Sequence, residues 1–381
     1  MKTFFCIFFF SLLNCFATFE VHEWGSINIV TGTDEVVVGD ISDDQSDLPN
    51  FVEVWKKQAV IQPIMIEKPI IYLYSDKVKN VRVSVRYPEG IFTQWWPKPN
   101  SFSPYPPRKG AKPILKNGML YWNVTLYPDK KFDSQMPKMD DHPWWNIARD
   151  VDAATVKTSR GGTEKFLFYR GAGVFKPTLK VDTDKQGKFL LSNEPGADSK
   201  DIYTIDVKEG AQPVIHYYPA IGGDKEKNKV TIKTFDDAAK HLQAQLERRG
   251  LFTKEAAGLV KIWKKQMFEK TGQRAMYMMS EADVDKMLPL NITPKPDKQV
   301  RVILVRFECL TASTRKQIEE WITQLGSKAY KDRQAAEKKL IETGRVGEAV
   351  MRSAFKVAED PEVKVRLKEI LQKITPKNPN P

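Results

Sequence analysis

Two pairs of side chains in this sequence have the chemistry of a metal or general-base site. His22 and Glu23 stand next to each other near the N-terminus, and Asp141 and His142 stand together in a later stretch that also contains proline. Imidazole and carboxylate groups are ligands of Zn²⁺ and Ca²⁺, so a loop that brings the second pair over the first would assemble a candidate metal site. A zinc ion there with an open coordination position would polarise water for hydrolysis. Further ligands could come from two residues elsewhere in the chain, Glu164 and His216.

The segment around His22 also has a purely structural interpretation. Two metal ligands on one helical face would need the spacing His-Glu-x-x-His, and only one histidine is present here. In a strand, the imidazole and the Glu23 carboxylate can instead hydrogen-bond loop backbone at the strand end, with Trp24 buried and Gly25 allowing a β-bulge. The sequence therefore leaves the cofactor open, and it assigns no catalytic residue.

Two tryptophan pairs form a second candidate site, for a ligand of another kind. Trp95-Trp96 and Trp144-Trp145 both lie in proline-containing stretches, which predict stiff surface loops. Exposed coplanar tryptophans would make a platform for sugar rings. The alternative is that they fold over the rim of a β-sandwich and cover its edge.

The beginning of the chain predicts export. Lys2 is followed by a short apolar run and by a small-residue site at Cys15-Phe16-Ala17, so residues 1–17 are typical of a signal peptide. We expect cleavage after Ala17, with lipidation at Cys15 as the alternative. The apolar run is shorter than the ~20 residues that span a bilayer, so we expect a periplasmic or extracellular protein without a membrane span. After cleavage Cys309 is the one cysteine left, and we expect it to be a buried, inert thiol.

The charge of the chain bears on its partners. The formal net charge is +12, but most basic residues have acidic neighbours, as in Lys225-Glu226-Lys227. This distribution predicts a mixed, solvated surface and argues against a nucleic-acid-binding stripe. The expected partners are a protein or an envelope polysaccharide.

In the first part of the chain, the elements that must position these residues are predicted to be β-strands. Val81–Tyr87 alternates between apolar and polar residues, which indicates a half-buried strand, and similar short segments recur between turn residues. We expect a first β unit over residues 18–155 and a second over 156–233, together forming a β-sandwich-like body.

The pattern changes to helical at Thr234. Thr234 is the expected cap of the first of two amphipathic helices, and Ser280 with Asp283 is the expected start of a short third one. These helices and a returning strand occupy residues 234–311, so we interpret them as a helical excursion from the sheet. Residues 312–381 are expected to be all-helical, with Asp360-Pro361 as a strong helix start. The predicted fold class is α+β, a β-sandwich-like body with an inserted helical pair and a C-terminal all-α hairpin.

The C-terminal part resembles HEAT-like helical hairpins over roughly 50 residues. In that family, stacked repeats present a protein-binding surface, and about three repeats are usually needed for independent stability. The sequence shows little more than one repeat, and this departure from the family suggests a hairpin docked on the β body. The resemblance is carried by Leu325-Gly326-Ser327, Arg333, Ala335-Ala336, Leu340, Gly344, Val350, Pro361-Glu362-Val363 and Ile370-Leu371.

A second resemblance covers most of the mature chain. The opening Val21–Ser26 is similar to the start of a group of uncharacterised exported bacterial proteins, and so are Glu67–Tyr74, Phe166–Gly171 and Leu288–Pro294. It implies a shared architecture and brings no activity with it. We therefore expect a non-enzymatic binding or scaffolding protein of the periplasm or envelope, with a metal-dependent hydrolase and a polysaccharide-binding module as alternatives.

Overall fold

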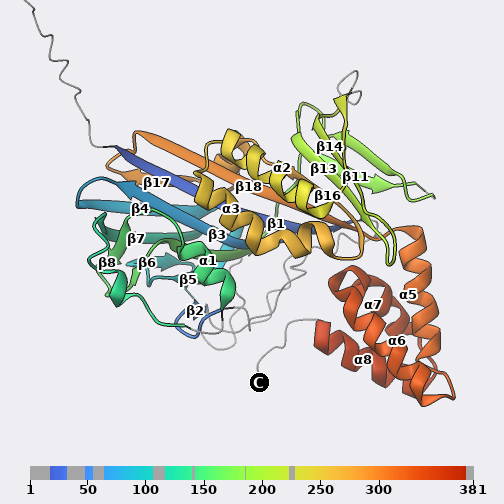
Figure 1. Cartoon of the computed structure of the whole chain (residues 1–381). Helices are drawn as coiled ribbons and strands as arrows, with labels where there is room; N and C mark the ends of the chain where they lie inside the picture. The colour runs from blue at the N-terminus through green and yellow to red at the C-terminus, as the bar shows by residue number, and fades with distance from the viewer. Residues whose placement is uncertain are drawn as a thin grey trace, which may run out of the picture.

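The computed structural model describes residues 18–31, 48–54, 64–105, 116–139, 142–184, 186–222 and 228–374. The fold is α+β, as predicted, with two β-sheets packed together, helices on the outer face of the larger sheet and a group of helices at the C-terminal end (Figure 1). Residues 1–17, where the signal peptide and Cys15 are predicted, lie outside the described residues.

The larger sheet, here called the main sheet, has ten strands and is built around β1 (Phe19–Thr31). β1 lies between β18 (Lys298–Cys309), which runs parallel to it, and β3 (Ile64–Ser75), which runs antiparallel. Beyond β18 follow β16 (Gly272–Met278), β13 (Lys200–Val207), β14 (Val214–Ala220) and β15 (Val230–Ile232). Beyond β3 follow β10 (Leu167–Gly173), β5 (Gly90–Trp96) and β2 (Glu53–Val54).

The second sheet covers one face of the main sheet. Alternation along β4 and β7 places Val81, Val83, Trp122 and Val124 toward the main sheet, where they join Val21 and the inward residues of β18 in one apolar core. The strands of this sheet are β17 (Leu290–Thr293), β4 (Lys79–Tyr87), β7 (Gly118–Tyr127), β8 (Thr155–Thr158) and β9 (Thr163–Glu164), with β6 (Ser101–Ser103) paired to β7. A separate hairpin joins β11 (Leu179–Thr183) to β12 (Phe189–Asn193).

Helices cover the opposite face of the main sheet. Trp24, Leu304 and Met276 point to this face and pack against Leu242 and Trp263 of the inserted helical pair in a second core. The helices are α1 (Pro143–Arg149), α2 (Phe235–Arg248) and α3 (Thr253–Lys264), which ends in a π-helical turn over Lys265–Glu269. Because β1 is covered on both sides, nearly all of its side chains are buried.

The inserted helical pair was predicted, but the chain returns to the main sheet earlier than we expected. β16 directly follows the π-helical turn, and α4 (Glu281–Met287) and β17 then precede β18. The strands of the two predicted β units and the returning strands are interleaved in the main sheet, where β10 pairs with β3 and β13 pairs with β16.

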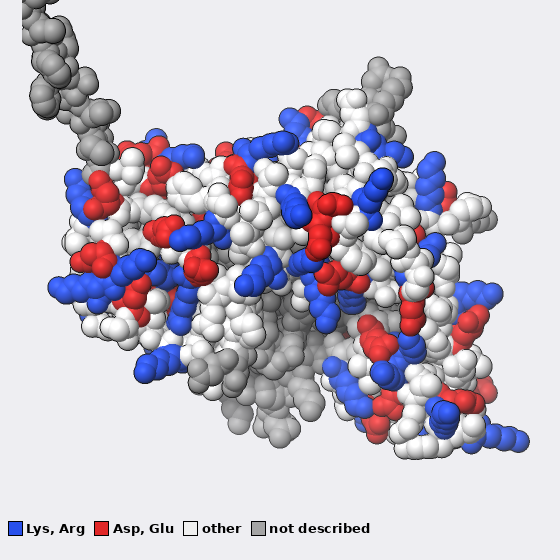
Figure 2. Space-filling view, viewed as in Figure 1, with Lys and Arg blue, Asp and Glu red and all other residues white. Residues whose placement is uncertain are grey.

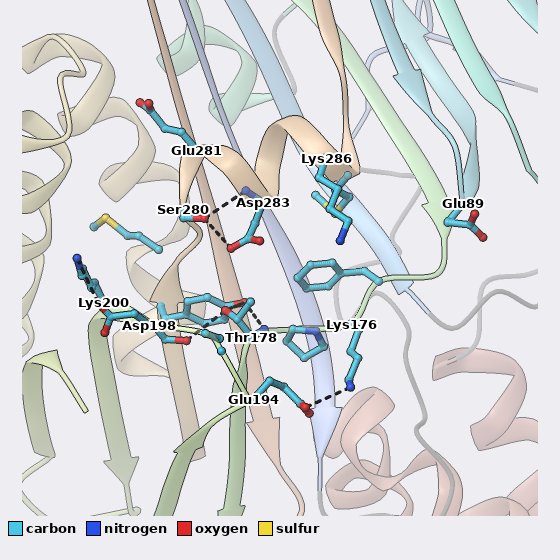
Figure 3. A pocket seen from close by; sticks show the side chains of 18 of the residues that line it. Glu89, Lys176, Thr178, Glu194, Asp198, Lys200, Ser280, Glu281, Asp283 and Lys286 are labelled. Carbon is cyan, nitrogen blue, oxygen red and sulfur yellow. Dashed lines mark hydrogen bonds and ion pairs between the residues drawn. The ribbon is translucent and has the colours of Figure 1, made fainter. Parts of the chain in front are cut away.

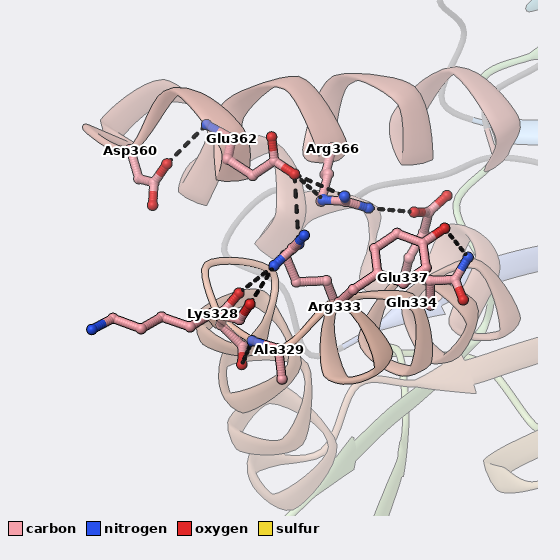
Figure 4. A network of polar contacts seen from close by, with 10 residues as sticks. Lys328, Ala329, Arg333, Gln334, Glu337, Asp360, Glu362 and Arg366 are labelled. Atoms are coloured by element: carbon pink, nitrogen blue, oxygen red, sulfur yellow. Dashed lines mark hydrogen bonds and ion pairs between the residues drawn. The ribbon is translucent and has the colours of Figure 1, made fainter.

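The C-terminal part is helical, as predicted, and has its own core. Leu340, Met351 and Leu367 are buried there together with Leu310 from the end of β18. Arg366 of α8 pairs with Glu337 of α6, and Arg333 of α6 lies 3.6 Å from Glu362 of α8 (Figure 4). The helices are α5 (Ala312–Gln324), α6 (Tyr330–Thr343), α7 (Glu348–Val357) and α8 (Pro361–Ile374), with a 3₁₀ turn at Gly344–Gly347.

Two surface properties bear on partners. Figure 2 shows basic and acidic side chains interspersed over the visible face of the described residues. No helix in the described part of the chain has both the length and the apolar character needed to cross a bilayer.

Candidate functional site

His22 and Glu23 point to opposite faces of the main sheet. Successive side chains of a strand alternate between the two faces, and the sheet register continues without a shift where β1 pairs with β18. His22 lies on the helix-covered face with Trp24, and Glu23 lies on the face covered by the second sheet. The structure therefore does not bring these two predicted ligands to one point. The prediction of a strand at this position already indicates this separation. The side chains of neighbouring residues in a strand point to opposite faces, so they cannot bind the same small ion.

His22 connects the central strand to a helix. Its Nδ1 lies 2.7 Å from Oε2 of Glu255, and its Nε2 lies 3.5 Å from Oε2 of Glu20. The same Oε2 of Glu255 accepts the backbone N–H of Phe252 at 2.8 Å, so this carboxylate both caps α3 and holds the histidine. The imidazole is fully buried and contacts the ring of Phe252, with the centroids 4.5 Å apart. His22 thus lies between the carboxylates of Glu255 and Glu20 and against an aromatic ring.

Glu23 belongs to a buried charge network on the other face. Arg301 of β18 donates from Nε to Oε2 of Glu23 at 2.7 Å, and the hydroxyl of Tyr169 donates to Oε1 at 2.5 Å. Nη1 of Arg301 reaches Asp285 of α4 at 2.6 Å. Burial, together with the charge of Glu23, raises the pKa of Tyr169 well above its ordinary value, so the phenol is protonated and donates its hydrogen bond. Both oxygens of Glu23 therefore have partners.

Those of the other predicted ligands that the structure describes belong to other elements than His22. His142 directly precedes α1, and Asp141 lies outside the described residues. Glu164 accepts the indole N–H of Trp145 at 3.0 Å and two hydrogen bonds from Arg149, at 2.8 and 2.6 Å. His216 is on β14, which is separated from β1 by three other strands of the main sheet. Among the described residues, no three histidine, cysteine or acidic side chains are grouped so as to hold a metal ion.

The four candidate tryptophans pack into the protein. Trp144 and Trp145 belong to α1, where we expected a loop, and Pro143 at the first helical position is the signal for this helix start. Both are buried against Phe168 of the main sheet. Trp95 is buried and its indole N–H donates to Glu53, whereas Trp96 is half-buried against Phe51. Cys309 is also buried, and burial raises the pKa of its thiol to about 12.

An open cleft of about 1200 Å³ lies beside α4. Ser280, Asp283 and Lys286 of α4 lie on one side of it, and the ion pair of Lys176 with Glu194 lies on the other (Figure 3). The cleft is thus formed where the turn after β4, the chain after β10, the segment between β12 and β13, and α4 converge. Its other lining residues include Glu89, Phe175, Thr178, Asp198, Lys200, Arg249 and Tyr277.

The cleft has charges of both signs and several hydroxyl groups. Hydrogen bonds from Lys180 and Lys176 hold the pKa of Glu194 below its ordinary value, so this carboxylate is ionised at neutral pH. The Tyr277 hydroxyl accepts the backbone N–H of Thr178 at 3.2 Å, and the Ser280 hydroxyl donates to Asp283 at 2.6 Å. This lining suits a ligand that both donates and accepts hydrogen bonds.

One wall of the cleft depends on the close approach of Tyr87 to Gly173. A Cβ atom at Gly173 would lie 2.5 Å from the Tyr87 ring and 2.6 Å from the Glu89 carbonyl oxygen. We expect Gly173→Ala to lower the free energy of unfolding by about 1–3 kcal/mol, because the backbone oxygen cannot move away without shifting the turn. Chemical denaturation checks this, with Gly258→Ala as a comparison, because a Cβ there would make only ordinary contacts, at 3.7 Å and beyond. Equal stability of Gly173→Ala and the parent would contradict the close packing.

Sequence reasoning missed the cleft entirely. Its residues come from five separated stretches of the chain, and none of them contains a motif that signals a site. The one local signal was the capping pair Ser280 and Asp283, which predicted a helix start and is confirmed by the hydrogen bond of the Asp283 backbone N–H to the serine hydroxyl.

No protein-family model matches this chain, and no curated protein or solved structure shows significant similarity to it. The function is therefore inferred from the geometry of the site.

Proposed function

We propose that this is an exported protein of the periplasm or envelope that binds a partner protein without catalysing a reaction, with the cleft beside α4 as its binding site. The observation that carries this proposal is the size and character of the cleft, about 1200 Å³ and open to solvent. This exceeds the ~300–1,000 Å³ of ordinary small-molecule pockets. Export is supported by the pattern of residues 1–17.

The chemistry of the lining favours a polypeptide segment. Lys176 and Lys286 can pair with acidic side chains of a partner, and Glu89 and Glu281 can pair with basic ones. Phe175, which is half-buried, offers a ring surface between these charges. A polypeptide presents both signs of charge along with backbone donors and acceptors, so it matches this mixture better than a uniformly charged ligand does.

The two alternative functions receive less support from the site residues. A hydrolase would need His22 and Glu23 to act at one centre, and they face opposite sides of the main sheet. A sugar platform would need exposed indole rings, and Trp95, Trp144 and Trp145 are buried. The C-terminal helices offer a second surface for scaffolding, and their core is separate from the two cores of the body.

The cleft is tested with a charge reversal on its wall. We expect Lys286→Glu to weaken binding of the partner by about tenfold or more, since it turns an attraction into a repulsion inside the cleft. The partner is first identified by cross-linking in the envelope fraction and is then titrated, as purified protein, into the parent and the variant. Lys261→Glu is the matched control, because Lys261 is also an exposed lysine in the last turn of a helix but lies outside the cleft.

Two results would contradict the proposal. Equal affinity of the partner for the parent and for Lys286→Glu would show that the cleft is not the binding site. A mature protein whose measured mass still includes residues 1–17 would show that the chain is not processed for export.

A further inference from the structure

A group of buried charges lies on the helix-covered face of the main sheet, near the ends of β1 and β18. The register pairs Asn28 with Arg306 and Glu308 with Arg274, so these four side chains occupy two adjacent rows on three neighbouring strands. Each of them is at most 3% exposed. Lys270, at the end of the π-helical turn, is close enough for its charge to act on Glu308. We call these five residues the cationic cluster.

The cationic cluster has more positive than negative charge. Nε of Arg274 lies 3.3 Å from Glu308, and Nε of Arg306 lies 3.2 Å from the same carboxylate. Among the described residues, no other acidic side chain forms an ion pair with Arg274, Arg306 or Lys270. Although burial raises the pKa of Glu308, the surrounding cations outweigh burial and hold this pKa below its ordinary value. One ionised carboxylate thus faces three basic side chains.

Several polar atoms of the same region have no hydrogen-bond partner. Both amide atoms of Asn28 and Nη1 of Arg274 are buried without one. Leaving a buried donor unsatisfied is unfavourable, and leaving a guanidinium without a counter-charge is more so. A water molecule would satisfy the hydrogen bonds but not the charge. An anion would satisfy the charge and the two donors, the Asn28 amide N–H and Nη1 of Arg274.

We propose that the cationic cluster binds a small oxyanion of the phosphate class between Asn28, Arg274 and Arg306. A tetrahedral oxyanion accepts several hydrogen bonds at once, so it can take N–H groups from the Asn28 amide and from the guanidinium groups. Lys270 adds a third positive charge. The site is on the opposite face of the sheet from Tyr277 of the cleft, so it is independent of the proposed partner-binding function.

The test uses inorganic phosphate as the probe and the whole protein. We expect the unfolding midpoint to rise with phosphate concentration, and to rise less in sodium chloride at matched pH and ionic strength, because an anion that binds the folded state stabilises it. Titration calorimetry should give a dissociation constant that weakens by about tenfold or more in Asn28→Asp. In chloride that variant should be more stable than the parent, since its carboxylate stands where the anion would bind.

Two further variants keep the proposal falsifiable. Lys270→Met should weaken phosphate binding, whereas Lys265→Met, an exposed lysine on the same π-helical turn, should leave it unchanged. Asn28→Leu removes the amide but adds no charge, so it should bind phosphate more tightly than Asn28→Asp does. The proposal is overturned if phosphate and chloride stabilise the parent equally, or if Asn28→Asp binds phosphate as the parent does.

Discussion

Glu23→Gln is expected to lower the free energy of unfolding by about 3–5 kcal/mol, because it removes the charge that compensates a buried arginine. The side chain of Arg301 is 2% exposed, and its contacts with Glu23 measure 2.5 and 2.7 Å. Although burial lowers the pKa of Arg301, Glu23, Tyr169 and Asp285 together more than offset this and raise it, so the guanidinium stays charged in the core. Chemical denaturation at neutral pH measures the difference between variant and parent.

The same arginine provides a matched control. Asp285 pairs with Nη1 of Arg301 at 2.6 Å, but the side chain of Asp285 is 58% exposed. Asp285→Asn should therefore change stability by only about 0–1 kcal/mol. Replacing both buried partners, as in Glu23→Leu with Arg301→Met, should restore much of the loss, because no uncompensated charge remains. Equal effects of Glu23→Gln and Asp285→Asn would contradict the role assigned to burial.

Local patterns in the sequence predicted much of the fold. Alternation identified β4, and apolar periodicity with Thr234 and Ser280 as caps identified α2 and α4. These signals act over a few residues, so they are readable from the chain itself. β16 was missed because the helical pattern of α3 extends through the π-helical turn nearly to its first residue, Gly272.

The pairing of the central strands could not be predicted in this way. β1 lies beside β18, and the contact of Glu23 with Arg301 joins residues 278 positions apart. Nothing local in either segment specifies this register. A sequence can therefore show that His22 and Glu23 are chemically versatile without showing which partners they meet.

The cationic cluster could likewise be predicted only in part from the sequence. Arg306 and Glu308 are two residues apart on a predicted strand, which places them on one face. This spacing could have indicated a charged patch within the core. That Arg274 and Asn28 share the face became visible only with the strand order, since β16 was not predicted.

Glu308→Gln is the second substitution with a large expected effect. It removes the carboxylate that pairs with both Arg274 and Arg306, so two buried cations lose their counter-charge. We expect a loss of about 3–5 kcal/mol in the free energy of unfolding at neutral pH, measured in chloride buffer. Glu342→Gln, at a side chain that is 50% exposed and pairs with two lysines, should change it by less than about 1 kcal/mol.

The effect of Glu308 should depend on pH in a defined direction. The pKa of Glu308 is lower in the folded protein than the ordinary value of about 4.3, so the unfolded chain takes up a proton first as the pH falls. The contribution of Glu308 is therefore complete above that ordinary value and is lost as the pH falls through the lower, folded-state pKa. The stability difference between parent and Glu308→Gln should shrink over this acidic range, and a difference that grew toward acid would contradict the ion pairs. Phosphate should stabilise Glu308→Gln more than it stabilises the parent, since the variant leaves one more cation without a partner.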